Sequence, residues 1–169
     1  MKSWPSSWTR ELATRFSLGF DPVAPATRTV GREAEFPVVD ANGWVGDVQR
    51  LMHELARQDP GLKAKHEDEL LVELRTERFI LTTEVGIGTV ELITGPRADL
   101  PTLESDHLLG LGYLLRAAEA TGQHILGMGI QPRSQASESM ICPKSRYRVL
   151  LETMGDSWLW FGLTASDQV

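Results

Sequence analysis

Apolar side chains recur every three to four residues in four segments of the chain, which is the spacing that places them on one side of an α-helix. Trp8, Leu12 and Phe16 follow Pro5 at intervals of four residues, so a helix is expected to begin soon after this proline. The expected helices cover residues 8–16, 48–55, 101–121 and 144–154.

Glycine and proline indicate where these helices end. An Asp-Pro-Gly sequence at 59–61 ends the second helix, and Gly122 suits the C-terminal stop of the long third helix. Gly155 follows the fourth helix, which should direct four side chains inward: Tyr147, Leu150, Leu151 and Met154. Two prolines in residues 21–26 predict a linker after the first helix.

Strand signals fill the segments between the helices. Segments rich in Val, Ile and Thr are bounded by turn residues, and a Gly-Ile-Gly sequence at 86–88 predicts a hairpin or a bulged turn. Gly95 and Pro96 are expected to close the strand that follows this turn. The expected strands cover residues 29–40, 70–74, 79–85, 89–94, 123–130 and 164–169. Because the hairpin favours antiparallel pairing, the pattern predicts an α+β domain.

The composition narrows the choice of function. The 169 residues are 41% hydrophobic and 24% charged, which suits a packed core, and the net charge of −6 argues against nucleic acid or an anionic membrane as a main partner. Cys142 is the single cysteine, so no internal disulfide can form and a cytoplasmic location is expected. Residues 1–20 lack the apolar stretch of a signal peptide, and no apolar run approaches the roughly 18 residues of a membrane helix.

Glu33 and Glu35 carry the sharpest chemical signal. Side chains alternate between the two faces of a strand, so both glutamates point the same way with Cα atoms roughly 6.6 Å apart. Phe36 and Val38 point the other way, toward a core. Two carboxylates on one face repel each other unless a cation lies between them, and Mg²⁺ prefers such oxygen ligands. The alternative is a solvated strand face with two surface glutamates.

Glu84 and Glu91 flank the turn at 86–88. If this turn forms a hairpin, the two residues lie on adjacent antiparallel strands and could face each other across the ladder. Glutamate is uncommon within strands rich in Ile, Val and Thr, so Glu91 is the better functional candidate of the two. Glu84 could instead face solvent near the tip of the hairpin.

Several motifs in a fixed order resemble those of a known family. They are Gly-Arg-Glu-Ala-Glu-Phe at 31–36, Val-Glu-Leu-Ile-Thr at 90–94, Gly-Met-Gly-Ile-Gln-Pro at 127–132 and Arg-Tyr at 146–147. Together with the long helix, this series resembles the glutamate–cysteine ligase type 2 family of carboxylate–amine ligases, over about residues 31–169. The resemblance implies a glutamine synthetase-like fold, in which helices pack outside a curved, largely antiparallel sheet that forms a funnel.

The resemblance also implies a chemistry. Such ligases use ATP and Mg²⁺ to join glutamate to cysteine or another amine through an acyl phosphate, the first step toward glutathione when the amine is cysteine. Glu33, Glu35 and Glu91 match the metal ligands of the family, and Glu84 matches an acidic position just before the last of these. Arg146 matches the arginine of the Arg-Tyr pair, with a structural or phosphate-facing role, unless it simply forms an ion pair with an acid such as Glu152.

Members of that family are usually longer, so the chain is expected to be the N-terminal part of the ligase. Residues 1–28 would be an N-terminal helix and linker, and 29–169 the N-terminal part of the catalytic domain, with an incomplete sheet whose open edges another copy of the chain could cover. The alternative is a noncatalytic remnant that binds Mg-nucleotide weakly or acts as an assembly partner.

Other polar and aromatic residues have simpler interpretations. His107 is expected to face solvent or pack on the long helix, and Cys142 is expected to be unreactive. Lys144 and Arg148 are predicted to be solvated residues of the fourth helix. Three aromatic residues near the C-terminus are predicted to be core or interface anchors: Trp158, Trp160 and Phe161.

Overall fold

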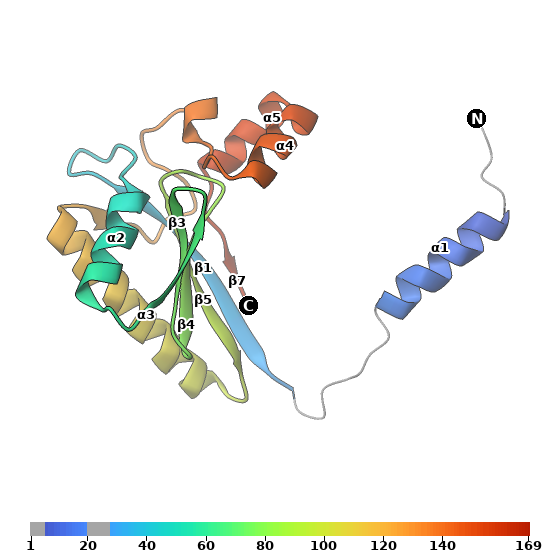
Figure 1. The fold of residues 1–169 in the computed structure, drawn as a ribbon, viewed down its shortest axis with the longest axis horizontal. Helices are drawn as coiled ribbons and strands as arrows, with labels where there is room; N and C mark the ends of the chain where they lie inside the picture. The colour runs from blue at the N-terminus through green and yellow to red at the C-terminus, as the bar shows by residue number, and fades with distance from the viewer. Residues whose placement is uncertain (1–5, 20–27) are drawn as a thin grey trace.

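A computed structural model describes residues 6–19 and 28–169, and its fold is α+β as predicted (Figure 1). The α-helices of the described residues are α1 Ser6–Gly19, α2 Val48–Gln58, α3 Leu100–Thr121, α4 Ser145–Met154 and α5 Asp156–Leu159. The strands are β1 Val30–Val39, β2 Lys63–Glu67, β3 Leu70–Arg75, β4 Phe79–Thr83, β5 Thr89–Arg97, β6 His124–Ile125 and β7 Asp167–Gln168. Two short 3₁₀ helices, Glu138–Met140 and Trp160–Gly162, flank α4 and α5.

All seven strands belong to one open antiparallel sheet. Its order is β2-β3-β4-β5-β1-β6, and β7 pairs with β1 on the same side as β6. The turn at 86–88 joins β4 to β5 as a hairpin, in which the amide of Thr89 donates to the carbonyl of Gly86. The predicted antiparallel sheet is therefore confirmed, and β1 and β5, its two longest strands, lie side by side.

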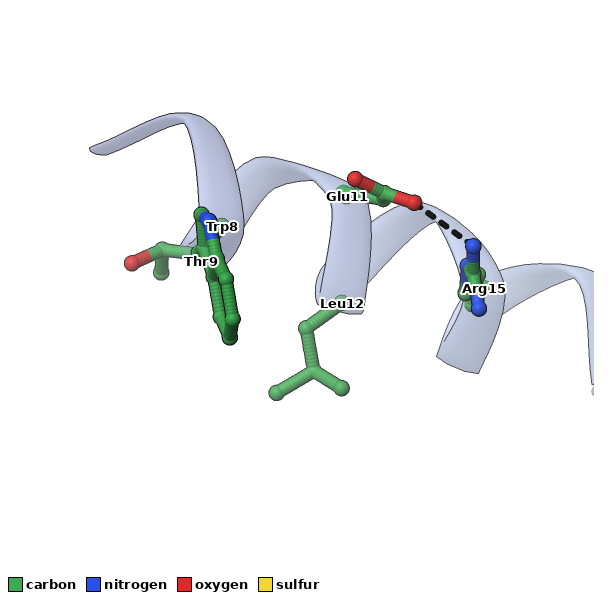
Figure 2. A pocket seen from close by; sticks show the side chains of 5 residues that line it. All are labelled: Trp8, Thr9, Glu11, Leu12 and Arg15. Carbon is green, nitrogen blue, oxygen red and sulfur yellow. Dashed lines mark hydrogen bonds and ion pairs between the residues drawn. The ribbon is translucent and has the colours of Figure 1, made fainter. Parts of the chain in front are cut away.

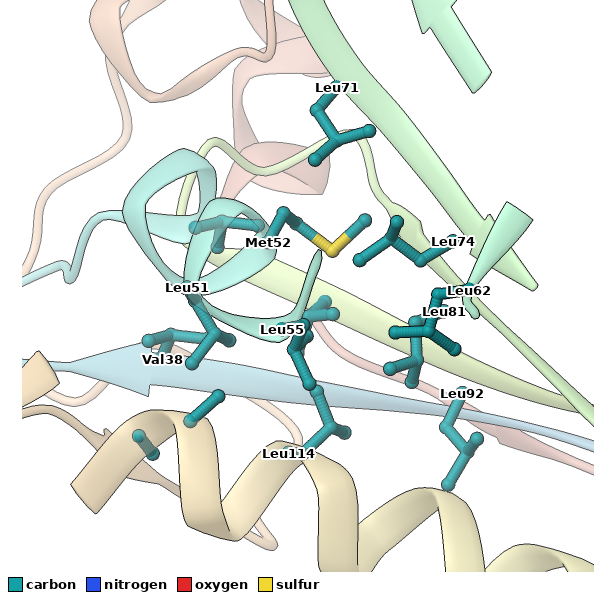
Figure 3. Packing of buried hydrophobic residues seen from close by; sticks show 14 of the residues in the cluster. Val38, Leu51, Met52, Leu55, Leu62, Leu71, Leu74, Leu81, Leu92 and Leu114 are labelled. Carbon is teal, nitrogen blue, oxygen red and sulfur yellow. The ribbon is translucent and has the colours of Figure 1, made fainter. Parts of the chain in front are cut away.

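Helices α2 and α3 cover one face of this sheet (Figure 1). Figure 3 shows the side chains of Leu51 and Leu55 from α2, and of Leu114 from α3, directed toward the strands. The strands contribute fully buried residues to the same cluster: Val38, Leu74, Leu81, Val90 and Leu92. Burial of each of these aliphatic side chains stabilises the fold by about 1.5–3 kcal/mol.

Both helices begin at an aspartate, which fixes their position along the sheet. The carboxylate of Asp47 accepts the amide of Arg50, and that of Asp99 accepts the amide of Thr102. Such N-caps contribute about 1 kcal/mol each. Gly122 ends α3 in the left-handed conformation, as predicted, with φ of 67°.

An ion network around the buried Asp106 joins the β4–β5 hairpin to α3. The carboxylate of Asp106, on α3, accepts hydrogen bonds from Arg78, just before β4, and from Arg97, the last residue of β5. Burial would raise the pKa of Asp106, but the two guanidinium groups outweigh this effect and hold the pKa below its usual range. The hairpin is thus attached to α3 at the ends of its strands that lie away from the turn.

Helix α1 confirms the periodicity around Trp8. Figure 2 shows Trp8 and Leu12 projecting to the same side of α1, while Arg15 forms an ion pair of 2.7 Å with Glu11 one turn away. The predicted linker at 21–26 lies outside the described residues. Within the described part of the chain, no helix combines the length and the hydropathy that crossing a bilayer requires.

Four predicted strands had wrong boundaries, each where local signals and tertiary pairing disagree. The strand expected at 79–85 ends at Thr83, so Glu84 lies just after β4. β5 runs through Gly95 and Pro96 to Arg97, because Arg97 pairs with Val30 of β1. The strand expected at 123–130 is limited to β6, and the one expected at 164–169 is limited to β7. Between these segments only the isolated bridge of Ile130 with Thr164 remains.

The fully exposed strand β2 was not predicted. It pairs with β3 at the edge of the sheet. All five of its residues are exposed, and they lack the alternation of apolar and polar side chains by which a strand is predicted. The pairing comes from the neighbouring strand, whose backbone groups are available at the edge.

Two adjacent leucines of α3 differ in burial, so their replacement should have different effects on stability. Leu114 is fully buried, whereas Leu115 is half exposed at 50%. We expect Leu114→Ala to lower the free energy of unfolding by about 2–5 kcal/mol, because it leaves a cavity between α3 and the sheet. Leu115→Ala is the matched control and should change it by about 0.5 kcal/mol or less. Urea denaturation followed by circular dichroism measures both, and equal losses would contradict this packing.

Candidate metal centre on the open face of the sheet

The face of the sheet opposite α2 and α3 carries a row of acidic residues. Val90 and Leu92 point into the core, so Glu91 between them points to the other face. Glu91 lies opposite Glu35 of β1 on one side and Thr82 of β4 on the other. Thr82 lies opposite Glu73 of β3, which extends the polar row across four strands.

Three carboxylates converge on this face. Oxygen atoms of Glu35, Glu84 and Glu91 all lie within 4.8 Å of one another. Glu91 is 7% exposed, and the other two are half-buried. Glu35 comes from β1, Glu84 from the position just after β4 and Glu91 from β5, so β1 and the β4–β5 hairpin together build the cluster.

The position of Glu84 differs from that expected. Its amide donates to the carbonyl of Thr89, and Glu91 pairs with Thr82, so the two glutamates are diagonal rather than directly opposite. The alternative in which Glu84 faces solvent near the hairpin tip does not hold, because its carboxylate lies close to that of Glu91. The length of the turn, which the sequence did not fix, decides this register.

Glu33 lies outside the three-carboxylate cluster. It shares the face of Glu35, as predicted, but it is exposed and lies opposite Ile93, two pairs further along β1. Its charge still acts on the site, since it contributes to the raised pKa of Glu91. Its predicted role as a metal ligand stays a prediction.

The cluster holds more negative charge than its surroundings compensate. Burial, followed by the charge of Glu84 and a hydrogen bond with it, raises the pKa of Glu91 to about 8. Burial also raises the pKa of Glu35, although hydrogen bonds from Ser166 oppose this rise. At neutral pH the apoprotein therefore relieves the repulsion by keeping a proton within the cluster.

Glu35 is held in place by the segment that leads into β7. Its amide donates to the carbonyl of Ser166 at 2.8 Å, and its Oε2 accepts the amide of Ser166 at 2.9 Å. One carboxylate oxygen is thus fixed by backbone, which orients the group over the sheet.

The donor set fits a hard divalent cation. Mg²⁺ binds oxygen ligands at about 2.1 Å, so adjacent ligand oxygens of its octahedron lie about 3 Å apart. One oxygen of each residue lies within 4.8 Å of the other two, so rotation of the side chains has to close these gaps by up to about 1.8 Å to reach that spacing. A cation would also replace the proton that the cluster otherwise keeps.

The start of α4 places further polar groups beside Glu84. Nη2 of Arg146 donates to the phenol oxygen of Tyr147 at 2.6 Å, and its guanidinium lies 4.6 Å from the centre of that ring. Arg146 thus contacts Tyr147, whereas the alternative considered from the sequence was an ion pair with an acid such as Glu152. Burial and the charge of Glu84 raise the pKa of Tyr147 to about 12, so the phenol stays protonated.

Lys144 was wrongly predicted to be solvated. It precedes α4 and is 4% exposed, and its Nζ donates to the carbonyl of Thr83 at the end of β4. Burial lowers its pKa, and the charge of Glu84 opposes this effect. Helical periodicity does not apply to a residue just outside the helix, so its burial could not be predicted from the apolar spacing. Met154 was likewise expected inward but is 44% exposed, because α4 ends there.

The predictions for His107, for Arg148 and for the aromatic residues near the C-terminus were confirmed only in part. His107 packs in the core side of α3 at 6% exposure and lies against Phe36. Trp158 is buried and stacks on Phe161 with ring centres 4.6 Å apart, while Trp160 is largely exposed. Arg148 is exposed on α4, as predicted.

A comparison with protein-family models decides the family. The model of glutamate–cysteine ligase family 2 (GCS2) matches residues 29–165, which include every candidate site residue. The chain belongs to glutamate–cysteine ligase family 2. Membership of GCS2 implies an ATP-dependent carboxylate–amine ligase. A search of curated proteins found no match to the chain.

The raised pKa of Glu91 predicts a pH-dependent penalty on the GCS2 domain. Both states are protonated well below pH 4.5, so no penalty exists there; as pH rises toward about 8, the unfolded chain loses this proton first and the fold is progressively destabilised. In EDTA at pH 8, Glu91→Gln should therefore raise the free energy of unfolding by about 1–3 kcal/mol, which allows for screening by water.

Urea denaturation at several pH values measures this gain in the free energy of unfolding. The gain should fall to near zero at pH 4. Glu119→Gln, on the exposed side of α3, is the matched control and should not reproduce it. A gain in Glu91→Gln that is the same at pH 4 and pH 8 would contradict the assigned repulsion.

Proposed function

We propose that the chain is the N-terminal part of an ATP- and Mg²⁺-dependent glutamate–cysteine ligase, or of a carboxylate–amine ligase with a related substrate. The observation that carries this proposal is the convergence of Glu35, Glu84 and Glu91 within a chain of the GCS2 family. Residues 29–169 form the part of the catalytic domain present here, and residues 1–28 precede it. The substrates are ATP, glutamate and cysteine or another amine, in the cytoplasm.

In this reaction an oxygen of the glutamate γ-carboxylate attacks the γ-phosphorus of ATP, and the bond from that phosphorus to ADP breaks. The amine nitrogen then attacks the acyl carbon of the resulting acyl phosphate, loses a proton and expels phosphate. Phosphoryl transfer depends mainly on positioning and on stabilisation of charge. A bound Mg²⁺ supplies charge neutralisation on the phosphate oxygens.

The residues of this chain have distinct tasks in the proposal. Glu35, Glu84 and Glu91 hold the cation, and Glu33 adds negative charge at the rim of the same face. Arg146 lies at the border of the acidic face and keeps a positive charge beside it, which suits contact with a phosphate. Because Glu91 keeps a proton when the cluster is empty, cation binding is coupled to proton release.

The direct test is Mg²⁺- and glutamate-dependent phosphate release from ATP, with cysteine compared against other amines. Glu35→Gln and Glu91→Gln should each lower the rate by about 100-fold or more, because each removes a charged ligand at the reacting phosphates. Glu119→Gln should leave the rate unchanged. If every amine acceptor fails to elicit phosphate release, the ligase activity of the chain is excluded.

Calorimetry with Mg-ATP separates the ligase from a noncatalytic remnant. We expect binding heat in the 169-residue chain and its loss in the combined Glu35→Gln and Glu91→Gln variant. Binding of Mg-ATP without phosphate release would favour a noncatalytic remnant that still binds nucleotide. Absence of binding heat in the intact chain would favour an assembly partner, such as one subunit of a homo-oligomer.

A further inference from the structure

The side chain of Tyr147 is embedded where the acidic face meets α4. The residue is 4% exposed, and its ring packs in a small apolar cluster with Ile141, Cys142 and Trp158. A ring held on several sides has little freedom to rotate, so its hydroxyl group occupies a defined position.

Hydrogen-bond polarity fixes the direction of the contacts that this hydroxyl makes. A guanidinium has donors and no acceptor, so the phenol oxygen must accept from Arg146 at 2.6 Å. The single proton of the phenol is then available to donate, and Oε2 of Glu84 lies 3.5 Å away. The order is Arg146 to Tyr147 to Glu84, and it ends on a carboxylate of the cluster.

The same carboxylate oxygen has a second donor. The amide of Val85 lies 3.0 Å from Oε2 of Glu84. One oxygen of Glu84 is therefore held by a backbone amide and faces the phenol. A carboxylate held through one oxygen can present the other to a shared ion.

The helix that carries Tyr147 is attached to the hairpin that carries the cluster. Nζ of Lys144 donates to the carbonyl of Thr83, and the amide of Cys142 donates to the carbonyl of Val85. Gly86 and Ile141 form a bridge between the same segments. Figure 1 shows α4 and α5 beside this end of the sheet. These attachments hold the phenol in register with Glu84.

We propose that Tyr147 is a positioning residue that orients the carboxylate of Glu84 for a divalent cation held by Glu35, Glu84 and Glu91. The inference rests on the proposed function, because it needs the cation site. The contact that would position Glu84 is the hydrogen bond of 3.5 Å from the phenol of Tyr147 to Oε2 of Glu84.

The first test measures Mn²⁺ affinity of the 169-residue chain by electron paramagnetic resonance, without nucleotide. Tyr147→Phe removes only the hydroxyl and should weaken affinity about 10-fold, as loss of an outer hydrogen bond does at other metal sites. The matched control is Tyr113→Phe, because the hydroxyl of Tyr113 donates to Asp59 at 2.8 Å and not to the cluster. This variant should bind Mn²⁺ as the unaltered chain does.

A double variant identifies the route of the effect. If Tyr147 acts through Glu84, Tyr147→Phe combined with Glu84→Gln should bind no more weakly than Glu84→Gln alone. Additive losses, or an affinity of Tyr147→Phe equal to that of the unaltered chain, would overturn the positioning role while leaving the cation site intact. Absence of Mn²⁺ binding in the unaltered chain would instead overturn the cation site and, with it, the role of Tyr147.

A second measurement does not depend on whether Tyr147→Phe folds. The chain has two tyrosines, so 3-fluorotyrosine incorporated into the Tyr113→Phe variant labels Tyr147 alone. We expect its ¹⁹F resonance to shift on addition of Mg²⁺, and the shift to disappear when Glu84→Gln is added. A resonance that does not respond to Mg²⁺ in a chain that binds Mn²⁺ would overturn the inference.

Discussion

The pairing register of β1 with β5 is the constraint on which the rest of the structure depends. Glu35 lies opposite Glu91, and on the other face Ala34 lies opposite Leu92. Because side chains alternate along a strand, a slip of one residue would turn the carboxylates into the leucine core and expose the apolar residues. The register that buries the leucines under α2 and α3 therefore also places Glu35 beside Glu91 on the opposite face.

This arrangement sets stability against function in one small region. Three carboxylates within 4.8 Å would separate if the backbone allowed it. Pairing of β1 with β5, the backbone contacts of Ser166 with Glu35 and the attachment of α4 prevent this separation. A repulsive cluster that persists because its surroundings over-determine it is typical of a site prepared for a ligand.

Much of this could be predicted from the sequence, and the failures have physical causes. The spacing of Leu51 and Leu55, and the alternation around Glu35, depend on local periods and were read correctly. Glu84 depends on the register after a turn of unspecified length, and Lys144 depends on a contact with a strand 61 residues earlier. Strand β2 carries no apolar period at all. Tyr147 was placed inward by its helical spacing, but its neighbour Glu84 is visible only in three dimensions.

Asp106 adds a mechanical consequence to this picture. Its contacts with Arg78 and Arg97 fasten the far ends of β4 and β5 to α3, and α4 fastens the turn end. The hairpin is therefore attached to neighbouring elements at both of its ends and cannot move as a flap hinged at one end. Any displacement of Glu84 or Glu91 as a ligand enters must come from bending along the strands or from side-chain rotation, since the hairpin has no free end about which to swing.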